Sequence, residues 1–203
     1  MSKFIVKPTP VEGIMIVKFA EGTAPVADEL LSAVENSELN ELLSPGDNFV
    51  QQRVERYPRG VLRGIYFQRR DAQARLLRVS SGSVLAVGVD LRPESKEYGA
   101  AHSANLSVEN GSMLYIPPYY GYGFLTLEAD TEVVELASRE DDPTSQSGII
   151  WDDEILAIDW QLERYDIDRK RLNISQRDKK LSSFRSYNPN ALWLNRPKIN
   201  RRR

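Results

Sequence analysis

The chain has 203 residues, of which 41% are hydrophobic and 28% charged, and its formal net charge is -2 at pH 7. This balance is typical of a soluble globular domain and gives no overall electrostatic reason to expect a nucleic-acid or membrane partner. The sequence has no cysteine, which excludes disulfides, thiolate metal ligands and cysteine nucleophiles and fits a reducing compartment.

A single histidine, His102, restricts the possible chemistry further. A histidine-rich metal site is excluded, and serine–histidine catalysis would depend on this one residue. His102 lies in Ala-Ala-His-Ser-Ala with no nucleophile elbow beside it. We therefore interpret it as a surface histidine.

The sequence shows no secretory or membrane-spanning signal. The short apolar run Gly13–Val17 is followed by Lys18 and Glu21 rather than by a small-residue cleavage site. No apolar run approaches the roughly 20 residues that a membrane helix needs. We therefore expect a cytoplasmic protein with no membrane partner.

The N-terminal part predicts an extended arm followed by a short helix. Residues 1–19 alternate apolar and polar side chains, and Pro8 and Pro10 disfavour a helix there. Such an arm could pair with the sheet edge of a neighbouring copy, which would favour a homodimer. Ala24–Leu43 carries leucines at helical spacing, and Pro45-Gly46 ends the pattern.

From residue 48 to residue 160 the apolar residues recur with period two, which indicates short strands. Turn residues predict three hairpins, at Ser81-Gly82, Glu109-Asn110-Gly111 and Glu128-Ala129-Asp130. Many short strands favour a sandwich or barrel over an open sheet with aggregation-prone edges. The predicted strands are Phe49–Val54, Val61–Gln68, Leu76–Ser80, Val84–Arg92, Ala104–Val108, Met113–Ile116, Tyr122–Leu127 and Thr131–Ser138.

The C-terminal part predicts less regular structure. Asp141–Gly148 has the composition of a polar loop, and Ser175–Phe184 predicts a short helix with Ser175 as N-cap and Asp178 in its first turn. Residues 186–203 contain two prolines and three terminal arginines, and we expect a flexible tail there. No repeat or linker divides the chain, so residues 1–203 are expected to form one domain with its core at 48–160.

Five segments in order resemble motifs of the dTDP-4-dehydrorhamnose 3,5-epimerase family, and the resemblance extends to about Leu181. The segments are Phe49-Val50-Gln51, Val61-Leu62-Arg63-Gly64-Ile65-Tyr66-Phe67-Gln68, Val89-Asp90-Leu91-Arg92, Ile116–Phe124 and the acidic run between Trp151 and Trp160. The resemblance implies an all-β fold, a cupin-type β-jelly roll, in a homodimer that needs no metal or organic cofactor.

The resemblance also implies a reaction in deoxysugar biosynthesis. The substrate would be a nucleotide diphosphate 4-keto-6-deoxy sugar, whose ketone acidifies the protons at C3 and C5. A base removes one proton to form an enolate, and an acid returns a proton on the opposite face. The outcome is epimerisation at C3, or at both C3 and C5.

Several site residues follow from the resemblance. Arg63 matches the arginine that contacts the diphosphate and sugar, and its guanidinium can bond two phosphate oxygens at once. Gln51 and Gln68 match polar positions that line the pocket. Asp178 looks like the aspartate that orients the catalytic base, and Tyr120 lies in the motif at the pocket.

The sequence departs from the family where the chemistry is concentrated. Tyr66 and Tyr122 stand where the family has histidines, and Arg75 stands for a lysine that stabilises the enolate. Glu135 occupies the position of a tyrosine acid, and Glu140 falls where the family has a tyrosine near the nucleotide base. Because both histidine positions carry tyrosines, the family's histidine mechanism cannot operate in this sequence.

We hypothesise that the acid and base have exchanged sides. A phenol has a reference pKa near 10, so Tyr66 would need a downward shift of about three units to act as a base. Glu135 would instead be the base and Tyr66 the acid, facing each other across the sugar, with Arg75 stabilising the enolate.

The same residues allow two alternative functions besides epimerisation. The tyrosines 120 and 122 fill a pocket as packing residues, or Glu135 is a solvated strand residue. The whole protein is then a catalytically inactive relative that binds a nucleotide sugar. A third function is an isomerase that acts on another small molecule.

Overall fold

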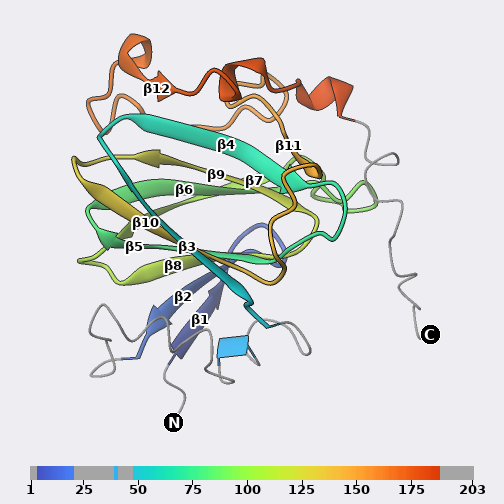
Figure 1. Ribbon diagram of the computed structural model, residues 1–203, viewed down its shortest axis with the longest axis horizontal. Helices are drawn as coiled ribbons and strands as arrows, with labels where there is room; N and C mark the ends of the chain where they lie inside the picture. Colours follow the sequence, from blue (N-terminus) through green and yellow to red (C-terminus); the bar gives the residue numbers. More distant parts are fainter. Residues whose placement is uncertain (1–3, 21–38, 41–47, 188–203) are drawn as a thin grey trace.

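The computed structural model describes residues 4–20, 39–40 and 48–187. Two antiparallel sheets face each other and confirm the predicted all-β class (Figure 1). The first sheet has the order β1-β2-β8-β5-β10-β3, and the second has the order β11-β4-β9-β6-β7 with β12 beside β4. The strands are β1 (Phe4–Pro8), β2 (Met15–Phe19), β3 (Gln51–Tyr57), β4 (Val61–Gln68), β5 (Arg75–Ser81), β6 (Ser83–Asp90), β7 (Ala101–Ser107), β8 (Ser112–Ile116), β9 (Tyr120–Thr126), β10 (Thr131–Ala137), β11 (Gln146–Gly148) and β12 (Asn173–Ile174).

The three predicted hairpins are wrong. The turns after Ser81, Ser107 and Thr126 each carry the chain from one sheet to the other, because β5, β8 and β10 belong to the first sheet and β6, β7 and β9 to the second. A turn residue signals a reversal of the chain but does not select the strand that pairs next. Each reversal therefore closes the side of the sandwich instead of extending one sheet.

Alternate side chains of the strands point into the space between the two sheets. Leu77, Phe124 and Val133 belong to one buried cluster that fills it. Glu135 is paired with Leu77, and Arg63 is paired with Phe124, so both polar residues lie on the same inner face as these apolar partners. The interior thus combines an apolar filling with a polar region, which positions the candidate site.

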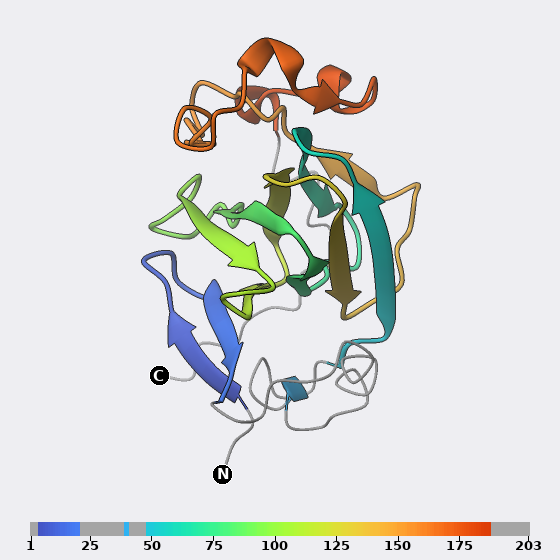
Figure 2. The same cartoon turned by 90° about the vertical axis from the view of Figure 1, so that its left-hand side faces the viewer.

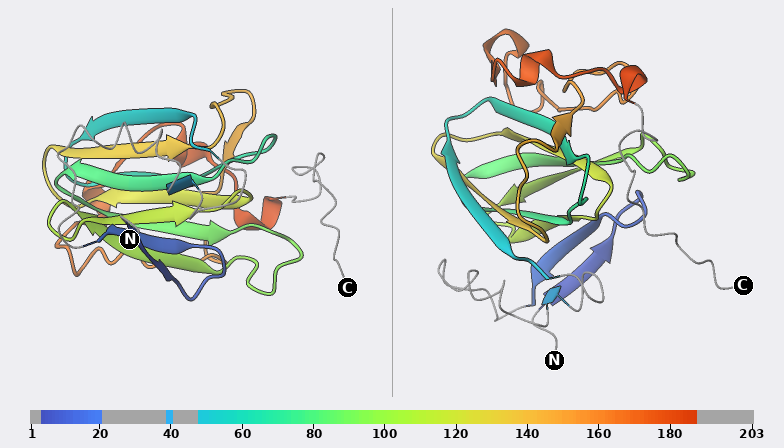
Figure 3. Two further views of the ribbon diagram at one scale, coloured as in Figure 1. Left: turned by 90° about the horizontal axis from the view of Figure 1, so that it is seen from below. Right: turned by 45° about the vertical axis from the view of Figure 1, so that its right-hand side comes forward.

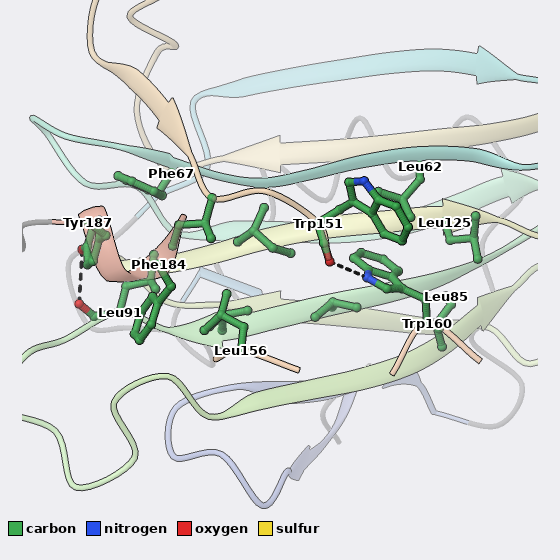
Figure 4. Close-up of a cluster of buried hydrophobic side chains, with 14 of the residues drawn as sticks. Leu62, Phe67, Leu85, Leu91, Leu125, Trp151, Leu156, Trp160, Phe184 and Tyr187 are labelled. Atoms are coloured by element: carbon green, nitrogen blue, oxygen red, sulfur yellow. Dashed lines mark hydrogen bonds between the residues drawn. The ribbon is translucent and has the colours of Figure 1, made fainter. Parts of the chain in front are cut away.

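The outer face of the second sheet is covered by the C-terminal segment. Leu62 and Leu85 of the sheet pack in a buried cluster with Trp151, Trp160 and Phe184 (Figure 4). The indole of Trp160 donates to the Trp151 carbonyl at 2.8 Å, which satisfies its one polar atom inside this layer. The acidic run between the two tryptophans is therefore a structural cover for the sheet.

The predicted N-terminal arm is a hairpin within its own chain. β1 pairs with β2, and β2 pairs with β8, so the hairpin extends the first sheet (Figure 3). It lies on the opposite side of the molecule from the C-terminal cover (Figure 2). The β2 edge of this arm is therefore paired within its own chain, and β1 is the outer strand of the first sheet in the described part.

Of the two predicted helices, one lies mostly outside the described residues and the other does not form. Ala24–Leu43 lies outside the described residues except for Leu39 and Asn40, which are helical. The helix Ser175–Phe184 is wrong, because the segment contains only the 3-10 turns Asp178–Lys180 (η3) and Phe184–Ser186 (η4); Arg169–Arg171 (η2) precedes it. The predicted cap does form, and the Asp178 amide donates to Ser175 Oγ at 3.0 Å.

Tertiary pairing explains why that helix ends after one turn. Leu181 is extended, and Ser182 bridges to Ile149 in parallel. The predicted tail also begins later than expected, because Tyr187 is buried against Phe67; residues 188–203 lie outside the described part. Within that part, no helix has the length and apolarity needed to span a bilayer.

Candidate active site between the two sheets

A local irregularity in β4 brings two functional side chains to one face. In a regular strand Arg63 and Tyr66, three residues apart, would point to opposite faces. The register of β4 against β9 shifts between them, and Gly64 lies there with φ +102°. A Cβ on Gly64 would lie 2.5 Å from the Tyr122 carbonyl oxygen, so only glycine fits. Arg63 Nε therefore comes within 3.4 Å of the Tyr66 hydroxyl.

Tyr66 and Asp178 form a buried pair across the edge of β4. The Tyr66 hydroxyl donates to Asp178 Oδ1 at 2.5 Å. Asp178 is fully buried, and its other carboxylate oxygen accepts from Ser175 Oγ at 2.8 Å. β12 pairs with the start of β4, and Ser182 bridges to Ile149, the residue after β11, so the segment from Ser175 to Leu181 passes the middle of β4. The structure thus places Asp178 against the residue expected from the sequence.

A second buried pair lies on β9 and β10. The Tyr122 hydroxyl donates to Glu135 Oε2 at 3.0 Å. Arg75 lies 3.6 Å from the same carboxylate and also pairs with Asp141, and its guanidinium lies 5.1 Å from the centre of the Tyr122 ring. Arg75 and Glu135 are both buried, so Glu135 is not a solvated strand residue. Tyr66 and Tyr122 meet edge to face, with ring centres 6.1 Å apart.

β3 supplies two residues that sequence reasoning missed, Glu55 and Tyr57. This strand runs to Tyr57, three residues beyond its predicted end. Arg63 donates to Glu55 at 3.1 Å and to the Tyr57 hydroxyl at 2.6 Å, and Tyr57 also donates to Glu55. Arg53 pairs with Asp141 at 2.6 Å. The signal was the alternation of polar side chains at 51, 53, 55 and 57, which an edge strand shares with any solvated strand.

The charges of the site nearly cancel. Three arginines and four carboxylates take part in these contacts. The arginines are Arg53, Arg63 and Arg75, and the carboxylates are Glu55, Glu135, Asp141 and Asp178. An anionic ligand must therefore compete with carboxylates that already hold the arginines.

The phenols in the site remain protonated at neutral pH. Burial raises the pKa of Tyr66 to about 12, and its hydrogen bond to Asp178 acts in the same direction, while Arg63 opposes them. Burial and the charge of Glu135 raise the pKa of Tyr122 above the usual range of a phenol, against the lowering effect of Arg75. Both tyrosines are therefore proton donors rather than bases.

The other predicted site residues lie around this centre. Gln51 Oε1 accepts from the Asp141 amide at 3.0 Å. The Tyr120 ring lines a small cavity beside the site, but its hydroxyl donates to the Glu12 carbonyl at 2.5 Å. Glu140 is exposed, and only its backbone carbonyl reaches inward, where it accepts from Gln73.

Gln68 and His102 are the remaining residues that the sequence singled out. Gln68 is buried at the end of β4 and lines the same small cavity as Tyr66, Arg75 and Tyr122. His102 is partly buried on β7, the last strand of the second sheet, and fits the interpretation as a surface histidine.

Comparisons with known proteins show the family and the fold of this chain. Residues 28–186 match the family model described as dTDP-4-dehydrorhamnose 3,5-epimerase. The chain belongs to the dTDP-4-dehydrorhamnose 3,5-epimerase family. It is 39% identical over 121 residues to the enzyme of that name from Salmonella typhimurium, covering 59% of this chain and 66% of the relative. It is 40% identical over 137 residues to the one from Methanothermobacter thermautotrophicus, covering 68% and 72%.

Solved structures of the family superpose on most of the chain. The dTDP-4-dehydrorhamnose 3,5-epimerase of Elizabethkingia anophelis has a TM-score of 0.76 and 26% identity, covering 92% of this chain and 99% of that one. The dTDP-6-deoxy-D-glucose-3,5-epimerase of Legionella pneumophila, solved with dTDP-4-keto-L-rhamnose, has a TM-score of 0.77 and 25% identity, covering 93% and 97%. The matched sequence segment itself spans just under two thirds of the Salmonella relative.

Proposed function

We propose that the protein epimerises a dTDP-4-keto-6-deoxy sugar at C3, or at C3 and C5, through an enolate. Two proton-handling pairs on the inner faces of the sheets support this proposal, Tyr66 with Asp178 and Tyr122 with Glu135. Arg75 adds a buried positive charge beside the second pair. Family membership supplies the class of substrate, and a cupin-type jelly roll would give it the enclosed interior that the reaction needs.

Binding of the diphosphate is assigned to Arg63. Its side chain is 27% exposed, so it lies at the border between the interior and solvent. Three of its hydrogen bonds hold it against β3 and Tyr66, which fixes the direction of the guanidinium. A diphosphate at this point would place the attached sugar towards Tyr66, further along the inner face of β4. Gln51 would contribute to the nucleotide side of the pocket.

Removal of the proton is assigned to Glu135. Its carboxylate would take a proton from the carbon next to the ketone, and the electron pair of that bond would move to the ketone oxygen. Arg75 would stabilise the resulting negative charge, because its own charge is buried and not neutralised by deprotonation. The Tyr122 hydrogen bond would hold the carboxylate in place.

Return of the proton is assigned to Tyr66. Its phenol would give a proton to the same carbon from the opposite face, and Arg63 at 3.4 Å would stabilise the phenolate that remains. Asp178 would act as a positioning residue, because it holds the hydroxyl through a hydrogen bond. The proton on Glu135 would then return to Tyr66 through solvent and restore both groups.

A second candidate function is binding of the nucleotide sugar without catalysis. The pairing of Arg53, Arg63 and Arg75 with carboxylates favours it, because this pairing weakens the positive field that an enolate requires. The raised pKa of Tyr66, about 12, also makes this phenol a weak acid. This alternative predicts measurable affinity for the nucleotide sugar with no change in its configuration.

The test is product analysis with purified protein and dTDP-4-keto-6-deoxyglucose. We expect nuclear magnetic resonance to detect an epimer at C3, or at both C3 and C5. Unchanged configuration together with calorimetric binding would replace the proposal by the binding function. Parallel reactions with the uridine, cytidine and guanosine diphosphate sugars would establish whether thymidine is required.

We also propose a homodimer, which rests on family membership alone. The arm pairs with its own chain through β2, and pairing of β1, the outer strand of the first sheet, with a neighbouring copy stays a prediction. Sedimentation analysis should give twice the mass of 23.1 kDa. A single species of monomer mass at micromolar concentration would contradict the dimer.

A further inference from the structure

A second arginine lies on the ring of Tyr66. The guanidinium carbon of Arg177 is 5.5 Å from the centre of that ring, the same distance as the guanidinium carbon of Arg63. Arg177 directly precedes Asp178, at the start of the 3-10 turn η3. This turn therefore places two groups on one phenol, the Asp178 carboxylate at the hydroxyl and the Arg177 guanidinium at the ring.

The two arginines at Tyr66 differ in their partners. Arg63 pairs with the Glu55 carboxylate at 3.1 Å, which offsets much of its charge. Arg177 is exposed, and it forms no ion pair with any residue in the part of the chain that the structure describes. Of these two cations, Arg177 is therefore the one whose charge remains available to Tyr66.

A phenolate at Tyr66 would need such a charge. Burial raises the pKa of Tyr66 to about 12, and Asp178 at the hydroxyl acts in the same direction. Tyr122, which meets the Tyr66 ring edge to face, is hydrogen-bonded to Glu135 and brings no positive charge. A phenolate shares its negative charge with its ring, so a cation on the ring stabilises it as well as a cation at the oxygen does.

We propose that Arg177 is a positioning residue that stabilises the Tyr66 phenolate formed when this tyrosine returns a proton to the sugar. The inference rests on the proposed function, which assigns the proton return to Tyr66. In that step the electron pair of the enolate forms the new carbon–hydrogen bond, and the pair of the phenol O–H bond stays on Tyr66. Arg177 touches no reacting atom and acts through the tyrosine alone.

This role separates the two halves of the reaction. Enolisation is assigned to Glu135 and Arg75, which belong to the first sheet, whereas Tyr66 belongs to the second. Loss of Arg177 should therefore slow epimer formation and leave solvent deuterium exchange at the same carbon unchanged. A residue that only held the fold would change both rates, and one that only bound the nucleotide would change neither at saturating sugar.

The test follows exchange and epimer formation together, by nuclear magnetic resonance in deuterated water with saturating dTDP-4-keto-6-deoxyglucose. Arg177→Gln should lower epimer formation about 3- to 10-fold, the effect of one charge at this distance near a protein surface, and leave exchange unchanged. Arg177→Lys keeps the charge and should recover most of the rate. Lys179→Gln is the matched control, because it removes a positive charge from the same turn, and it should change neither rate.

A double variant establishes whether Arg177 acts through Tyr66. In the Tyr66→Phe background Arg177→Gln should cause no further loss, because no phenolate can form there. A further loss in that background would overturn the assignment, as would equal epimer formation by the wild-type protein and Arg177→Gln. A parallel fall of exchange and epimer formation in Arg177→Gln would also overturn it. Absence of both processes in the wild-type protein would instead reject the proposed function.

Discussion

The Tyr66 hydroxyl lies 2.5 Å from Asp178 Oδ1, although 112 residues separate the two in the sequence. The contact depends on the segment after β12, which runs along β4 from the β12 pairing to the bridge between Ser182 and Ile149. It makes the C-terminal segment part of the candidate site as well as the cover of the second sheet. The direction of the Tyr66 hydroxyl proton is therefore set by Asp178, which lies outside β4 and β9.

Replacement of Tyr66 by phenylalanine should separate enolisation from epimerisation. The variant loses the proposed acid but keeps Glu135, so we expect solvent deuterium to enter the sugar while epimer formation falls at least about 100-fold. The measurement is nuclear magnetic resonance of one sample in deuterated water. Tyr98→Phe is the control, because Tyr98 packs on Phe184 on the outer face of the second sheet. Equal loss of exchange and epimerisation would make Tyr66 the base.

Glu135→Gln should abolish both processes. The substitution retains an acceptor for the Tyr122 hydroxyl but removes the base, and we expect exchange to fall at least about 100-fold. Glu132→Gln makes the same change of charge on the same strand, at an ion pair with Arg56, and should leave the rate unchanged. Normal exchange in the Glu135 variant would reject the exchanged roles of acid and base.

Glu55→Gln should tighten the binding of a nucleotide diphosphate. Glu55 holds Arg63 in a partly exposed ion pair, which the incoming diphosphate has to displace. Exposed pairs of this kind are weak, so we expect the calorimetric dissociation constant of dTDP to fall about 2- to 5-fold. Glu132→Gln again controls for the change in net charge. Weaker binding in the Glu55 variant would show that this carboxylate positions Arg63 for the ligand.

Stability should decline in alkaline solution because of the buried phenols. The pKa of Tyr122 is raised in the folded protein, so above pH 10 the unfolded chain loses a proton that the native state retains. Raising the pH therefore favours unfolding. Tyr122→Phe removes this contribution, and its free energy of unfolding should fall less steeply, by at most about 1.4 kcal/mol per pH unit above pH 10.

Urea unfolding at several pH values between 8 and about 11.5 measures that difference in slope. Tyr165→Phe serves as the control, since the Tyr165 hydroxyl takes part only in an exposed hydrogen bond with Asn105. Identical slopes for the wild-type protein and Tyr122→Phe would mean that Tyr122 titrates as an ordinary phenol.

Local pattern and resemblance predicted different parts of the structure. Strand Val61–Gln68 was predicted at its observed bounds, because its apolar and aromatic residues favour a strand, although they are buried along almost its whole length rather than in alternation. The pairing of strands was not predicted, since the turn at Ser81-Gly82 marks a reversal and leaves the choice of sheet to the packing of the whole domain. β11 was missed because Gln146–Gly148 is short and polar.

Some contacts of the candidate site were also predicted, and others were not. The contact between Tyr66 and Asp178 was expected from the resemblance, because it depends on motif order rather than on local pattern. Glu55 and Tyr57 were missed, since charged and polar residues on an edge strand usually face solvent. Their inward direction follows from the pairing of β3 with β10, which only the assembled sheet reveals.

Solvent deuterium exchange by the wild-type protein tests the central claim most directly. Enolisation is the step that the Glu135, Arg75 and Tyr66 arrangement is proposed to catalyse, and exchange detects it even where the epimer does not accumulate. We predict deuterium at C3, or at C3 and C5, of dTDP-4-keto-6-deoxyglucose. Bound sugar with no deuterium at either carbon would contradict the account and leave a protein that holds the nucleotide sugar without acting on it.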